Sequence, residues 1–98
     1  MATYIILFRF TQKGIKEIKD SPARITAAKE IISKMGGEVR AFYAVLGSQY
    51  DTMFILDAPS DEKLGGMVLA IDKLGYVRTQ THRLFNEDEF GKIVSSLP

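Results

Sequence analysis

Few side chains in this sequence could do chemistry, and they are scattered along the chain. His82 is the only histidine, and its intrinsic pKa suits proton transfer near neutral pH. Tyr43 and Asp51 could also move a proton, while Tyr50 and Arg24 could hold a polar or anionic group of a ligand. The candidate catalytic residues are therefore His82, Tyr43 and Asp51, and the candidate ligand-binding residues are Arg24, Tyr43, Tyr50 and His82.

Each candidate also has an ordinary structural interpretation. For His82 we favour an edge-strand residue that hydrogen-bonds its neighbours. Tyr50 and Asp51 are typical of a turn and a strand end, because aspartate accepts backbone amide hydrogens there. Arg24 lies near the positive end of a predicted helix, which is unfavourable for a cation. An ion pair and an anion site are equal alternatives for it.

The composition excludes several kinds of site. With no cysteine and one histidine, the chain has no thiolate ligands and too few imidazoles, so we expect no metal site and no cofactor. Serine-triad chemistry lacks support, since there is no Gly-x-Ser-x-Gly motif around a nucleophile. Gly36 and Gly37 end a predicted helix instead of opening one, which argues against a phosphate loop.

Charge and hydropathy indicate which partners and which cellular compartment to expect. Thirteen basic residues balance twelve acidic ones, so we expect no nucleic-acid partner. The first apolar run ends at Arg9, far short of the roughly 20 residues of a membrane span, so we expect no membrane partner. The start of the chain lacks the basic region of a signal peptide. We expect a single domain over residues 1–98 in the cytoplasm.

The elements that must position the candidate residues follow from hydrophobic periodicity. Strands are predicted over residues 4–10, 38–46, 51–57 and 76–84, and helices over 21–35, 59–74 and a terminal segment that Asn86 and Glu89 open as a capping box. The first strand is apolar on both faces, whereas the last is polar and belongs at a sheet edge. This order predicts an α+β fold, the ferredoxin-like βαββαβ plait. Its antiparallel sheet has the order 4-1-3-2, with helices on one face and an additional C-terminal helix.

Local patterns add finer expectations. Ser21 should cap the first helix, and Ile15 and Ile18 should anchor a helical turn against the core. In the predicted helix over residues 59–74, the pair Gly65-Gly66 favours a loose first turn over close packing.

The hairpin between the second and third strands sets which side chains share a face. We expect Leu46 opposite Asp51 and therefore Arg40 opposite Asp57. This register places Ala41, Tyr43 and Val45 on one face with Thr52, Phe54 and Leu56. It also allows Tyr4, Phe8, Tyr43 and Phe54 to form one aromatic floor.

Two helices in so short a chain cover only one face of the sheet. The first strand presents Ile5 and Leu7 on the other face, which would leave an apolar patch exposed. We expect a second copy to cover it in a homodimer or a larger homo-oligomer. The alternative is that the terminal helix covers this face.

At this level of detail the sequence resembles the GYD-domain family of the dimeric α/β-barrel superfamily. The resemblance rests on five short motifs in order: Thr11 with Gly14, Ser21-Pro22-x-Arg24, Leu46-Gly47 with Tyr50-Asp51, Ala58-Pro59-x-Asp61, and Val77-Arg78-Thr79-x-Thr81. The family hairpin usually has one residue between its glycine and Tyr-Asp, whereas this chain has Ser48 and Gln49. The resemblance implies the fold and a dimeric assembly, but no reaction. Relatives in the superfamily that bind haem through one histidine leave that role open for His82 as an alternative.

Three functional hypotheses remain. The leading one is a small homo-oligomeric accessory or binding module for a small organic ligand. The alternatives are a cofactor-free enzyme resembling monooxygenases or isomerases, and a metabolite-sensing regulator. Any pocket should lie between sheet and helices, near the 47–51 hairpin or the start of the first helix. Its expected polar lining is Arg24, Tyr43, Tyr50, Asp51 and His82.

Overall fold

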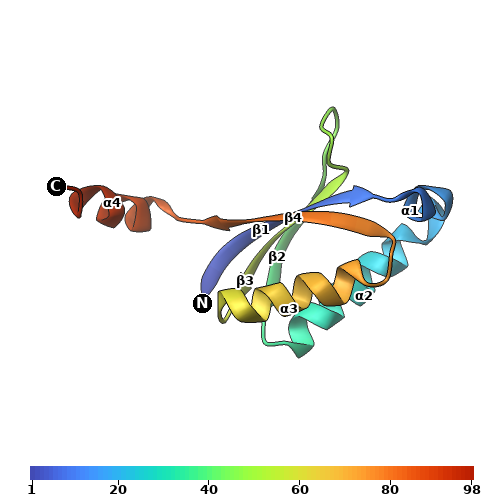
Figure 1. The fold of residues 1–98 in the computed structure, drawn as a ribbon, viewed down its shortest axis with the longest axis horizontal. Helices are drawn as coiled ribbons and strands as arrows, with labels where there is room; N and C mark the ends of the chain where they lie inside the picture. Colours follow the sequence, from blue (N-terminus) through green and yellow to red (C-terminus); the bar gives the residue numbers. More distant parts are fainter.

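The computed structural model describes all residues, 1–98, as one four-stranded sheet with helices (Figure 1). The elements in chain order are β1 (Ala2–Phe10), α1 (Gln12–Lys16), the 3₁₀ turn η1 (Ile18–Asp20), α2 (Ser21–Lys34), β2 (Glu38–Ala44), β3 (Thr52–Ala58), α3 (Asp61–Asp72), β4 (Val77–Leu84) and α4 (Glu87–Ser95). None of the α-helices combines the length and the apolar character that crossing a membrane requires.

The sheet has the order β2-β3-β1-β4, and every neighbouring pair is antiparallel. This confirms the ferredoxin-like plait and the order 4-1-3-2. The two central strands are the apolar ones, and the polar β4 lies at an edge. The apolar strands therefore occupy the centre of the sheet, where both edges are paired. The polar strand β4 lies at an edge, where its side chains remain in contact with water.

The two faces of the sheet differ in what covers them. Helices α2 and α3 lie side by side across one face (Figure 1). Beneath them is the core, made by Tyr4, Ile6, Phe8, Ile32, Phe54, Leu56, Ala58, Leu64, Met67 and Ile71. The other face, here called the open face, carries no helix, and its central apolar side chains are Ile5, Leu7, Met53 and Ile55. The helices thus lie on one face only, as the sequence predicted.

The register of the β2–β3 hairpin differs from the expected one by one residue. Phe42 pairs with Phe54 and Tyr43 with Met53, and the amide of Val45 donates to the carbonyl of Asp51. Because side chains alternate along a strand, a one-residue change moves Tyr43 to the open face. The prediction that Tyr43 shares a face with Phe54 is therefore wrong.

The predicted contact between Arg40 and Asp57 nevertheless forms, as an ion pair. The register shifts between Val39 and Ala41, so Arg40 sits in a bulge and not directly opposite Asp57. A bulge re-aims side chains, and this one directs Arg40 towards the carboxylate on the open face.

The segment between β1 and α2 differs from expectation in two ways. Ile15 and Ile18 are 56% and 43% exposed, so neither anchors a turn against the core. Ser21 is the first residue of α2 and makes no cap bond, because η1 runs directly into the helix and Asp20 takes the N-cap position. Both predictions were wrong, since the connection is itself helical and supplies its own backbone partners.

The double glycine of α3 is a site of close packing at one of its two positions. A Cβ at Gly66 would lie 2.8 Å from Cε of Met35 in α2, whereas a Cβ at Gly65 would meet open space. The helix is continuous from Asp61, with Ser60 as its cap. The expected loose turn is thus absent, and Gly66 lets α2 and α3 approach each other.

Helix α4 stands apart from the rest of the chain (Figure 1). The predicted capping box is confirmed: Asn86 accepts from the Glu89 amide at 2.8 Å, and Glu89 accepts from the Asn86 amide at 3.0 Å. No residue of α4 is buried, and the helix extends beyond the end of β4 without covering the open face.

Candidate functional site

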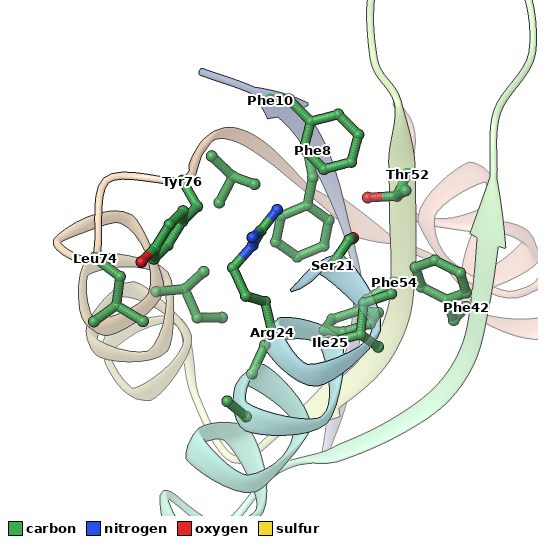
Figure 2. Close-up of a pocket in the computed structure, with 14 residues that line it drawn as sticks. Phe8, Phe10, Ser21, Arg24, Ile25, Phe42, Thr52, Phe54, Leu74 and Tyr76 are labelled. Atoms are coloured by element: carbon green, nitrogen blue, oxygen red, sulfur yellow. The ribbon is translucent and has the colours of Figure 1, made fainter. Parts of the chain in front are cut away.

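A cavity of about 80 Å³ lies between the sheet and α2, at the start of that helix. We call it the Arg24 pocket (Figure 2). Most of its wall is apolar, and the polar exceptions are Ser21, Arg24 and Thr52. The lining residues are Phe8, Phe10, Ser21, Arg24, Ile25, Ala27, Ala28, Phe42, Thr52, Phe54, Ile71, Leu74, Tyr76 and Val77. The position matches the sequence expectation of a pocket between sheet and helices near the start of the first long helix.

The floor of the pocket is a row of aromatic rings from the three strands β1, β3 and β2. The Phe8 and Phe54 rings are 5.0 Å apart and meet edge to face, and the Phe42 ring lies 6.0 Å from Phe54. Edge-to-face pairs are favourable because the positive ring edge meets the negative face. The expected aromatic floor therefore exists in part: Phe42 takes the place predicted for Tyr43, and Tyr4 does not line the pocket.

Arg24 lies within the first turn of α2, and its guanidinium reaches back towards the preceding connection. It donates to the carbonyl of Glu17 at 2.8 Å and to the carbonyl of Gly14 at 3.2 Å. These acceptors are uncharged, and the two ion pairs of the chain involve Arg40 and Arg83 instead. Arg24 therefore keeps an unneutralised charge, and three of its five N–H donors remain for another partner.

Tyr76 forms the opposite side of the pocket mouth and carries two cations on its ring. The guanidinium carbon of Arg24 is 4.5 Å from the ring centroid, and Nζ of Lys13 is 4.4 Å from it. In Figure 2 the Arg24 side chain rises between Tyr76 and the phenylalanines of β1. The ring attracts cations through its negative face, so it gathers positive charge at the mouth.

The backbone around the mouth is closely tied to Tyr76. The Thr11 amide donates to the Tyr76 carbonyl at 3.0 Å, and the Thr11 hydroxyl donates to the Gly75 carbonyl at 2.7 Å. A Cβ at Gly14 would lie only 2.1 Å from the Tyr76 carbonyl oxygen, so only glycine fits there. The motif Thr11 with Gly14 therefore fixes α1 against the pocket.

The other predicted site residues lie outside this pocket. Tyr43, 61% exposed, and His82 both project from the open face, on the two edge strands. Tyr50 donates its hydroxyl to Oε1 of Gln80 at 2.6 Å. Three strand spacings separate β2 from β4, and the register offsets the two residues by two positions, which places Tyr43 and His82 roughly 16 Å apart.

Asp51 has a clear structural role at the base of the hairpin. Its Oδ2 accepts from the Phe10 amide at 2.8 Å, and its own amide donates to the Phe8 carbonyl at 2.8 Å. Asp51 thereby ties the end of β1 to the hairpin. Of the five predicted polar residues, only Arg24 lines the pocket, while the sequence missed Thr52, Phe42 and Tyr76 as partners.

Four side chains have shifted pKa values, and all lie outside the pocket: Arg40, Glu89 and the two buried groups Tyr4 and Asp57. The pKa of Tyr4 is raised, because its hydroxyl donates to the Asp61 carboxylate and burial disfavours the phenolate. The pKa of Asp57 is lowered, chiefly by the hydrogen bond from Thr3 and then by Arg40, against the opposing effect of burial. The structure contains no cluster of three histidine or carboxylate side chains that could hold a metal ion.

Comparison with known proteins gives a family and a fold. The sequence model of the GYD domain matches residues 4–94. No curated protein matches the sequence. A structure from Thermus thermophilus, TTHA0845, is similar with 27% identity and a TM-score of 0.56, over 88% of this chain and 95% of that one.

Two more distant structures share the fold. A feast or famine regulatory protein from M. tuberculosis, complexed with L-methionine, is 17% identical with a TM-score of 0.66. The match covers 88% of this chain and 51% of the regulator, so the chain spans about half the regulator's length. The dehydrochlorinase TftG from Burkholderia phenoliruptrix, in complex with 2,5-dihydroxybenzoquinone, is 15% identical with a TM-score of 0.61, over 88% and 96% of the two chains.

Proposed function

Since the chain belongs to the GYD domain family, we propose that it is a homodimeric binding module that holds a short-chain carboxylate in the Arg24 pocket. The observation that carries this proposal is an apolar cavity with one uncompensated guanidinium at its mouth. An apolar wall with few polar groups is typical of small-ligand sites. The cation selects an anionic head group, and the apolar wall selects a hydrocarbon tail.

The size of the cavity limits the ligand. Its 80 Å³ is about half of the 150 Å³ cavity that binds benzene in an engineered protein, and it falls below the range of drug-sized sites. A short branched chain of a few carbons fits this space, and an aromatic ring does not. The carboxylate stays at the mouth, where it accepts from Arg24 in the strong geometry of a charge-assisted hydrogen bond.

A binding role is favoured over the enzyme hypothesis by the chemistry of the pocket wall. The wall offers two hydroxyls, a guanidinium and the phenol of Tyr76 but no imidazole and no carboxylate, and those two groups are the commonest proton carriers near neutral pH. General acid–base catalysis needs a group within hydrogen-bond reach of the substrate. A sensing regulator would use the same binding step, so the binding proposal includes that alternative as a further role.

The open face supports the homodimer in this proposal. Its apolar centre, Ile5, Leu7, Met53 and Ile55, has no helix over it. A contiguous apolar patch of this kind is typical of an interaction surface. A second copy that presents the same face buries both patches about a two-fold axis.

Isothermal titration calorimetry with isobutyrate, isovalerate and 4-methylpentanoate tests the binding proposal. We expect isovalerate to bind and its neutral amide, isovaleramide, to bind at least tenfold more weakly. Arg24→Gln should weaken isovalerate binding about 10- to 100-fold, because a hydrogen bond to a charged group contributes about 1.5–3 kcal/mol.

Two variants serve as controls for this experiment. Ala28→Leu fills the cavity and should abolish binding while the fold remains intact, because Ala28 lines the wall without contacting the charge. Arg78→Gln removes an exposed arginine on β4 and should bind isovalerate like the wild type. Equal binding of acid and amide, or an unchanged affinity in Ala28→Leu, would overturn the proposal.

A further inference from the structure

Helix α4 has an apolar side that nothing in its own chain covers. Phe90, Ile93 and Val94 recur at the spacing of one helix face, Leu97 follows just beyond the end of the helix, and all four are exposed. No residue of the helix is buried. An amphipathic helix in this state lacks the packing partner that its apolar side requires.

The helix is nevertheless held in a defined direction. Arg83, at the end of β4, donates to Oε2 of Glu89 at 3.2 Å and to the carbonyl of Thr3 at 3.3 Å. Its guanidinium also lies 4.5 Å from the Phe85 ring centroid. The ion pair with Glu89 links the end of β4 to the first turn of α4, and the capping box closes that turn. The apolar side is thus presented on an ordered arm.

The area of the whole chain shows that it is less compact than a typical protein of its mass. The accessible surface is 6644 Å², whereas a compact protein of 11.0 kDa exposes about 5,600 Å². The surplus of about 1,000 Å² resembles the roughly 800 Å² that one partner contributes to a standard interface. The radius of gyration, 14.7 Å, also exceeds the value of about 13 Å for a compact domain of this length.

A second unpartnered apolar group lies at the opposite end of the sheet. Leu46, at the tip of the β2–β3 hairpin, is 102% exposed, and the hairpin rises from the open-face side (Figure 1). The hairpin leaves the sheet where Thr52 pairs with Phe8, whereas α4 leaves it where Leu84 pairs with Thr3. The two apolar elements are therefore at opposite ends of the central strand.

We propose that α4 is an arm that packs against the hairpin of a second copy of this chain, at residues 45–50. The inference rests on the proposed open-face dimer. When two open faces meet about a two-fold axis that runs obliquely across the strands, at right angles to the line from the hairpin to α4, each α4 lies beside the partner's hairpin. The contact then forms twice, which is the self-complementarity that a two-fold interface requires. The arm and the hairpin thereby bury the surfaces that each chain leaves exposed.

Sedimentation equilibrium of the full chain tests the contribution of the arm. Ile93→Glu should raise the dimer dissociation constant at least tenfold, because it places a charge on the apolar side. Lys92→Glu, a charge change outside that side, should stay within twofold of the wild type. Ile93 lies outside the core, so the amide spectrum of residues 1–84 reports an intact fold in the variant.

Cross-linking locates the contact, and the absence of native cysteines makes it clean. An equal mixture of Leu46→Cys chains and Ile93→Cys chains should form a disulfide-linked dimer containing one chain of each kind. Leu46→Cys mixed with Lys92→Cys should form at least tenfold less of this product.

Each result decides a different part of the account. If Ile93→Glu dimerises like the wild type, or the Leu46→Cys and Ile93→Cys mixture yields no mixed dimer, the arm proposal is wrong while the open-face dimer stands. A wild-type monomer at micromolar concentration would overturn both the arm and the dimer. Carboxylate binding, measured by calorimetry, would be unaffected by either result.

Discussion

Asp57 is a buried carboxylate on the face of the sheet that carries no helix. It is 5% exposed, accepts from the Thr3 hydroxyl at 2.7 Å, and pairs with Arg40 across the hairpin. The Thr3 hydrogen bond is the largest influence on its pKa, which lies below the ordinary value of 3.8. Arg40 is more than half exposed, so solvent screens its share. The hydroxyl of Thr3 is thus the main partner that keeps the carboxylate ionised.

Thr3→Val should lower the free energy of unfolding by about 1.5–3 kcal/mol at pH 7, because a hydrogen bond to a buried charged group is lost. The native pKa of Asp57 is depressed, so its contribution is present above the unfolded pKa of about 4. It is lost as the pH falls through the native pKa. The difference between wild type and variant should therefore shrink below about pH 4, as measured by urea denaturation across pH.

The control for this prediction is Thr81→Val, on the neighbouring strand β4. Thr81 pairs with Ile6 and has no carboxylate partner, so its substitution should show no such pH dependence. A constant difference between Thr3→Val and the wild type from pH 7 to pH 3 would contradict the assignment of Thr3 as the chief cause.

Among the individual residues, the sequence predicted Arg24 as part of the site but did not predict its neighbours in the pocket wall. The Ser21-Pro22 start of the helix places Arg24 in the first turn, where the structure has it. Tyr43 was misplaced because the five-residue link from Leu46 to Tyr50 permits several registers, and one step reverses the face. Phe42 therefore lines the pocket where Tyr43 was expected.

Substitutions at the two glycines of α3 distinguish the effect of helix propensity, at Gly65, from the effect of packing against α2, at Gly66. Gly65→Ala should raise the free energy of unfolding by about 0.5–1 kcal/mol, since alanine restricts the unfolded chain and meets open space in the native one. Gly66→Ala should gain less or lose stability, because its Cβ would lie 2.8 Å from Cε of Met35. Chemical denaturation of the two single variants measures this difference.

Met35→Ala supplies the matched background for this comparison. In that background Gly66→Ala should gain as much as Gly65→Ala, because the neighbouring methyl group is gone. Equal gains from both alanines in the wild-type background would show that α2 and α3 do not meet at Gly66.

Among the elements, strands and long helices were predictable and the connection after β1 was not. Polarity alone assigned β4 to the edge, and the stripe of α3 identified its core side. Ile15 and Ile18 suggested an anchored turn, yet both stay exposed. Arg24 holds that segment by donating to the carbonyls of Gly14 and Glu17. This contact could not be predicted, because a hydrogen bond from a long side chain to the backbone produces no periodic pattern in the sequence.

In the whole molecule, the candidate site residues lie on two different faces of the sheet. Arg24 lies under the helices, while Tyr43 and His82 lie on the open face that we propose to be the dimer interface. The plait follows from element order and polarity. The division between faces does not, because it depends on the hairpin register and on where α4 points.

A titration of the ¹⁵N-labelled wild type with isovalerate, followed by amide chemical shifts, tests the central claim most directly, since each face carries its own reporters. We predict that the saturable shifts fall on residues of the Arg24 pocket: Ser21, Arg24, Ala28, Thr52 and Tyr76. Saturable shifts confined to Tyr43, Tyr50 and His82, or no saturable shifts at all, would contradict it.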